Sequence, residues 1–79
     1  MSSADNSYRL QLNNLMQSRR ESWKPEYATT GQQHEEVHTC TIFVKGIQYG
    51  SAMKGRTKND AFEAAARSAL ADYRNKHGI

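Results

Sequence analysis

The alanine-rich stretch from residue 58 to residue 73 constrains the fold more than any other part of this sequence. Its apolar residues recur with the spacing of one face of an α-helix, and they are Ala61, Ala65, Ala66, Ala69, Leu70 and Tyr73. Thr57 stands three residues before Asp60, a pattern typical of a helix N-cap. Because most side chains on this face are small, the helix can lie close to a flat partner, and we expect that partner to be a β-sheet.

The start of this helix is basic, with Lys54, Arg56 and Lys58 placed around Gly55. A helix N-terminus already favours anions, since its free N–H groups and the macrodipole present positive charge there. The net charge of +3 favours an anionic partner only weakly by itself. The position of the charges is more informative, and it predicts a phosphate-binding helix start that lies on a sheet.

The remaining elements follow from periodicity and from residues that break helices. The apolar spacing from Tyr8 to Met16 predicts an amphipathic first helix over residues 8–20. Pro25 ends any helix before it, because proline lacks an N–H group. Three strands are then expected over residues 26–30, 37–44 and 47–53. The sequence therefore predicts an α+β fold of order α-β-β-β-α, with a three-stranded antiparallel sheet and both helices packed on one face.

A two-residue hairpin turn at Lys45-Gly46 fixes the register of the last two strands. The expected pairs are Val44 with Ile47, Phe43 with Gln48 and Ile42 with Tyr49. Since side chains alternate along a strand, one set of residues shares the predicted core face, namely His38, Cys40, Ile42, Val44, Ile47 and Tyr49. Phe43 is expected on the opposite, exposed face.

Length and composition bound the domain organisation. The chain of 79 residues is long enough for one domain with a small core. Its single cysteine excludes an intrachain disulfide and suits a reducing, intracellular compartment, cytoplasmic or nuclear. No apolar run reaches membrane-spanning length, so we expect no membrane partner. We expect a disordered lead over residues 1–6, a domain over 7–75 and a flexible tail over 76–79.

Other chemistry has little support in the sequence. A structural zinc site needs paired, close-spaced ligands together with thiolates, and the group His34, His38, Cys40 and His77 offers only one thiol. We therefore expect no metal, no cofactor and no catalytic residue. Trp23 is expected to pack under the end of the first helix, and base stacking is the alternative role.

Five short motifs occur in an order that resembles the double-stranded RNA-binding domain family. They are Leu12-Asn13-Asn14-Leu15, Pro25-Glu26-Tyr27, Gly31-Gln32-Gln33-His34, Tyr49-Gly50, and Thr57-Lys58 followed by the alanines. The resemblance covers about residues 8–73. It implies a domain that binds one face of an A-form duplex by shape, in three regions that together span about 16 base pairs.

The resemblance also implies the residues that contact RNA. Asn13 and Asn14, with Gln17 one turn later, occupy first-helix positions that meet a minor groove. His34 ends the loop that enters the next minor groove. Lys58, with Lys54 and Arg56, faces phosphates across the major groove between them.

The chain departs from the family at the start of the last helix. The family pattern Lys-Lys-x-Ala-Lys is here Lys58-Asn59-Asp60-Ala61-Phe62, so two lysines are missing and Phe62 stands at a phosphate-binding position. Glu35 and Glu36 follow His34, where they repel phosphates, and low RNA affinity is expected. The alternative is a domain that mainly binds another protein or a second copy of such a domain, with Phe43 and Phe62 as exposed interface residues.

Overall fold

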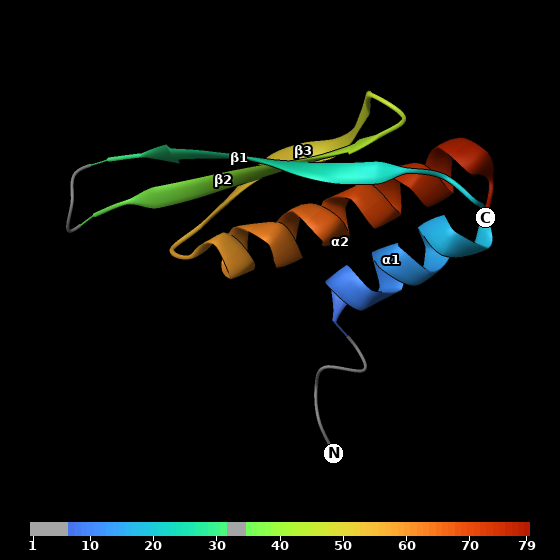
Figure 1. Ribbon diagram of the computed structural model, residues 1–79, viewed down its shortest axis with the longest axis horizontal. Helices are drawn as coiled ribbons and strands as arrows, with labels where there is room; N and C mark the ends of the chain where they lie inside the picture. Colours follow the sequence, from blue (N-terminus) through green and yellow to red (C-terminus); the bar gives the residue numbers. More distant parts are fainter. Residues whose placement is uncertain (1–6, 32–34) are drawn as a thin grey trace, which may run out of the picture.

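The structure is a computed structural model that describes residues 7–31 and 35–79. Its elements in chain order are α1 (Tyr8–Ser18), β1 (Trp23–Thr30), β2 (Val37–Val44), β3 (Ile47–Gly55) and α2 (Lys58–His77). The strands form one antiparallel sheet in the order β1-β2-β3. Figure 1 shows both helices on the same side of this sheet. The predicted α+β fold, α-β-β-β-α with both helices on one face, is confirmed.

Both helices begin at side-chain caps. Ser7 Oγ accepts a hydrogen bond from Leu10 N at 3.1 Å, and Thr57 Oγ1 accepts one from Asp60 N at 3.0 Å, which confirms the cap predicted at Thr57. The described helices include none that is long and apolar enough to cross a membrane.

The helix ends differ from the predicted boundaries. α1 ends at Ser18, two residues before the predicted end, and Arg20 then adopts a positive φ of 56° that no α-helix continues. α2 extends to His77 and is capped by Gly78 in the left-handed conformation. Lys76 and His77, which we expected in the flexible tail, are therefore helical.

The hairpin between β2 and β3 confirms the predicted turn. Lys45 and Gly46 both have positive φ, 53° and 79°, and the three predicted pairs from Val44–Ile47 to Ile42–Tyr49 are present. Beyond Ile42 the register shifts, because Cys40 pairs with Met53. One residue of β2 thus faces three of β3, and the sequence did not predict this irregularity.

The irregular part of β3 is bonded to α2 instead of to a strand. Gly50 N donates to Asp72 Oδ2 at 2.8 Å, and Ser51 N donates to Ser68 Oγ at 2.9 Å. The Gly50 hydrogen bond holds the pKa of Asp72 below its ordinary value. These bonds use N–H groups that an edge strand would otherwise offer to another chain.

The core lies between the sheet and α2. All six predicted apolar residues of α2 are buried, and Cys40, Ile42, Val44 and Tyr49 oppose them from the sheet. Ile47 pairs with Val44 and so shares its face as predicted, but Ile47 is 57% exposed and does not join the core. Ile47 opens an edge strand directly after the turn, so no further strand covers it.

Contacts at both ends of α1 hold it against α2. The Glu63 carboxylate accepts hydrogen bonds from Tyr8 N at 2.9 Å and Arg9 N at 3.3 Å. At the other end, the Tyr73 hydroxyl accepts from Arg19 Nε at 2.7 Å and donates to Glu21 at 3.1 Å. The relative position of the helices, and of the polar groups on them, is thereby fixed.

Candidate nucleic-acid interface

A surface groove lies where α1, β1 and the start of α2 meet. Its lining residues come from all three elements, with Arg9 and Asn13 from α1, Trp23, Pro25 and Tyr27 from β1, and Asn59 and Phe62 from α2. These segments are far apart in the sequence but adjacent in the fold (Figure 1). The groove joins two of the regions that the sequence assigns to RNA binding.

The α1 side of the groove is polar. Arg9, Asn13 and Gln17 are spaced four residues apart and so follow one side of the helix. Asn13 is half-buried and lines the groove, whereas Gln17 and Asn14 are exposed. Of the three predicted α1 residues, Asn13 is therefore the one that the structure brings into the groove.

The basic residues predicted at the start of α2 lie near the α2 side of the groove. Lys58 Nζ lies 5.6 Å from the centre of the Tyr27 ring, which itself lines the groove. This distance is typical of a cation–π contact. Arg56 is exposed in the two-residue connection between β3 and α2. Lys58 therefore lies against a ring that lines the same groove as Asn13.

Lys54 is not brought to this groove. It pairs with Thr39, next to the pair of Cys40 with Met53. Because Cys40 is buried beneath the helices and side chains alternate along a strand, Lys54 belongs to the opposite face of the sheet. It therefore lies apart from Lys58, although the two are only four positions apart in the sequence.

Phe62 is not an exposed interface residue, so this part of the alternative prediction is wrong. Its side chain is 6% exposed, and its ring stacks on Trp23 with a centroid distance of 5.9 Å and an interplanar angle of 6°. The Arg9 guanidinium lies 5.7 Å from the same ring. Phe62 is buried because Trp23, from the start of β1, covers it.

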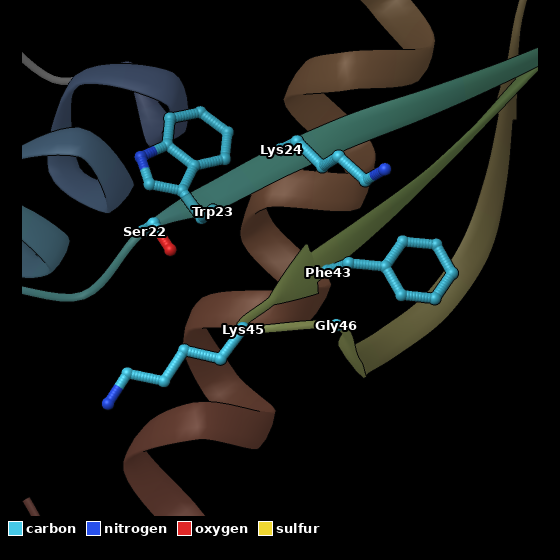
Figure 2. A pocket seen from close by; sticks show the side chains of 6 residues that line it. All are labelled: Ser22, Trp23, Lys24, Phe43, Lys45 and Gly46. Atoms are coloured by element: carbon cyan, nitrogen blue, oxygen red, sulfur yellow. The ribbon is translucent and has the colours of Figure 1, made fainter.

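Phe43 lies on the outer sheet face, as predicted. It pairs with Lys24 on one side and Gln48 on the other, and it is half-buried. Figure 2 shows Lys24 and Phe43 pointing away from Trp23, whose ring turns toward α1. These residues border a shallow pocket that also includes Ser22, Lys45 and Gly46. A role for Phe43 in protein binding stays a prediction.

The third predicted region is described only in part. His34 lies outside the described residues. Glu35 and Glu36, which follow it, are exposed and precede β2. Their charges oppose phosphate binding next to this connection.

Sequence reasoning missed four residues of the groove, namely Arg9, Pro25, Tyr27 and Asn59. Arg9 stands one helical turn before Asn13, and this spacing was a usable signal. Partial burial raises the pKa of Tyr27, Cys40 adds to that rise, and Arg9 opposes it. Tyr27 and Arg9 therefore influence each other although 18 positions separate them in the chain.

Comparison with known proteins gives the family. Residues 8–73 match the double-stranded RNA binding motif, and no curated protein matches the chain. A solution structure of the second dsRBD of DRB4 is similar with 25% identity and a TM-score of 0.64, and the match covers 87% of this chain and 97% of that one. A solution structure of both DRB4 dsRBDs with their linker has 26% identity and a TM-score of 0.67, and covers 94% of this chain and 48% of that one. The chain belongs to the double-stranded RNA-binding domain family, as its motifs indicate.

Proposed function

We propose that this domain binds double-stranded RNA by shape, largely without sequence preference, through α1, the connection between β1 and β2, and the basic start of α2. One observation carries the proposal. Asn13 of α1 lines the groove whose Tyr27 ring lies beneath the Lys58 ammonium. A minor-groove amide and a phosphate-binding cation are thus available on one surface.

The chemistry of these groups suits an A-form duplex. Its wide, shallow minor groove displays 2′-hydroxyls, which both donate and accept hydrogen bonds, as the amides of Asn13, Asn14 and Gln17 also do. Its phosphates reward the cations of Arg56 and Lys58 near the N-terminus of α2. Contacts to 2′-hydroxyls distinguish RNA from DNA, and contacts to phosphates supply affinity for any sequence.

The affinity is expected to be modest. Asn59 and Phe62 replace two lysines, and Asp60 adds a negative charge in the first turn of α2. Each phosphate contact contributes roughly 0.9 to the slope of log K against log salt concentration. With Arg56 and Lys58 as the contacting cations, the slope of log K against log salt concentration should be near −2, since each contact contributes about −0.9.

Titration against a perfect RNA duplex and the matching DNA duplex, at two salt concentrations, tests this proposal. The RNA should bind more tightly than the DNA. Changing Arg56→Ala together with Lys58→Ala should weaken RNA binding and remove most of the salt dependence. Lys54→Ala is the control for a general effect of charge, because it removes one positive charge from the opposite sheet face. Equal binding by the double variant and the unchanged protein would show that the phosphate contacts lie elsewhere.

The alternative, a domain that mainly binds protein, keeps less support. Phe62 is buried, and the backbone N–H groups of Gly50 and Ser51 donate hydrogen bonds to side chains of α2 instead of to a strand of another protein. Phe43 is the one residue of the predicted protein interface that stays accessible in part. Phe43→Ser should abolish any dimer seen by sedimentation if this alternative holds.

A further inference from the structure

The groove between α1, β1 and α2 has a lining that phosphate binding does not explain. Trp23, Tyr27 and Phe62 supply three aromatic side chains, and among the residues that the structure describes no acidic side chain lines the groove. A phosphate needs N–H donors, whereas an aromatic surface favours the flat face of another ring. The groove measures about 410 Å³, which lies within the usual range for small-ligand pockets, roughly 300–1,000 Å³.

The charges at the groove indicate an electron-rich or anionic occupant. Arg9 lies over Phe62 and Lys58 over Tyr27, at 5.7 and 5.6 Å from the ring centres. Within residues 7–31 and 35–79, neither cation takes part in an ion pair. Both are therefore available to a ligand that carries negative charge next to a flat ring, which is the chemistry of a nucleotide.

Amide groups from two elements supply the hydrogen bonds that a base edge needs. Asn13 belongs to α1 and Asn59 to α2, and both line the groove. Each amide can donate and accept, so together they suit the mixed donors and acceptors of a nucleobase. Aromatic stacking, an arginine plane and amide contacts are the means by which proteins hold unpaired bases.

We propose that this groove binds one unpaired nucleobase next to a duplex, such as a single-nucleotide bulge. The inference rests on the proposed function, because the duplex brings the base to the groove. Tyr27, 42% exposed, offers the accessible ring, and Trp23 borders the same space while stacked on Phe62. The base would stack against this aromatic wall, while Arg9 and Lys58 contact its flanking phosphates.

The single tryptophan makes the proposal directly measurable. Trp23 is the one tryptophan of the chain, so its fluorescence reports on the groove. Three RNAs are titrated, namely a perfect duplex, the same duplex with one bulged nucleotide, and the same duplex with an abasic bulge. The bulged base should increase affinity at least about fivefold and quench Trp23, since stacking is worth roughly 1–3 kcal/mol per base. The abasic bulge should bind like the perfect duplex.

Variants test whether the groove causes the preference. Tyr27→Ala and Asn59→Ala should each reduce the ratio of the affinities for bulged and perfect RNA. Both residues are exposed, so their loss spares the core. Tyr8→Ala is the control, because Tyr8 is a 38% exposed tyrosine in contact with Arg67 outside the groove.

The outcomes separate this inference from the proposed function. Equal affinity for the three RNAs, with unchanged Trp23 emission, overturns the inference and leaves duplex binding intact. An undiminished ratio in both groove variants overturns it as well, and it assigns the bulge contact to another surface. Absence of binding to all three RNAs overturns the proposed function together with the inference.

Discussion

Gly50 offers the sharpest test of how β3 is joined to α2. It has a φ of +74°, and its amide donates to Asp72. A Cβ atom added at this position would lie 2.6 Å from Ala69 N and 2.7 Å from the Ser68 carbonyl carbon. Real Cβ atoms do not approach other atoms so closely, and both neighbours are backbone, so Gly50→Ala forces β3 and α2 apart.

The structure allows the cost to be divided into two parts. A positive φ costs an L-residue roughly 1–2 kcal/mol, and overpacking costs roughly 1–3 kcal/mol more. Gly50→Ala should therefore lower the free energy of unfolding by about 2–5 kcal/mol. A domain of 79 residues has a total near 4–12 kcal/mol, at roughly 0.05–0.15 kcal/mol per residue. The variant would lose a large share of its stability.

Gly46→Ala is the matched control, because Gly46 has a φ of +79° with nothing within 4 Å of the added Cβ atom. It should show only the backbone cost, about 1–2 kcal/mol. Urea unfolding of both variants, followed by Trp23 fluorescence and by circular dichroism, gives the two free energies. Equal losses for the two variants would refute the close contact between β3 and α2.

Two further predictions concern the core. Phe62→Lys restores the charge of the family pattern, but it should lower the free energy of unfolding by at least about 3 kcal/mol, as loss of a buried phenylalanine does. An unchanged midpoint of urea unfolding would mean that the Phe62 ring is exposed. Burial raises the pKa of the Cys40 thiol to about 11, so the native protein should resist iodoacetamide at pH 8 and react once unfolded in urea. Rapid labelling of the native protein would contradict the burial of Cys40. Because the pKa of the Cys40 thiol is raised in the folded state, the stabilisation from its buried neutral form is complete below the pKa of the unfolded chain and is lost as the pH rises toward 11.

The features that the sequence predicted correctly depend on neighbours in the chain. The Thr57 cap needs only Asp60, three residues later, and the Lys45-Gly46 turn needs only the two strands beside it. The buried face of α2 follows from a helical period within a single segment. Each of these signals lies within a short window, where local geometry decides the outcome.

The features that the sequence did not predict depend on distant residues. The register shift of β3 is held by Asp72 and Ser68, which lie 22 and 17 positions away from their partners. Phe62 follows Ala61 in a helix whose sheet-facing side was evident, but its burial requires Trp23 from another element. The periodicity of the helix sequence gives no information on where the Trp23 side chain, which belongs to β1, will pack.

The exchange of lysine for Phe62 changes the kind of interaction that this surface can make. A lysine would add a phosphate contact, which strengthens binding to every duplex and weakens as salt rises. Phe62 instead supports Trp23 and lies beneath Arg9, and so builds a groove with an aromatic wall. Stacking is much less sensitive to salt than phosphate contact, and it requires a base that is free of its pair. On the proposed function and the inference from the groove, the domain loses some affinity for every duplex and gains a preference for duplexes with an unpaired base. The free energy of this preference should form a larger share of the total binding free energy as the salt concentration increases.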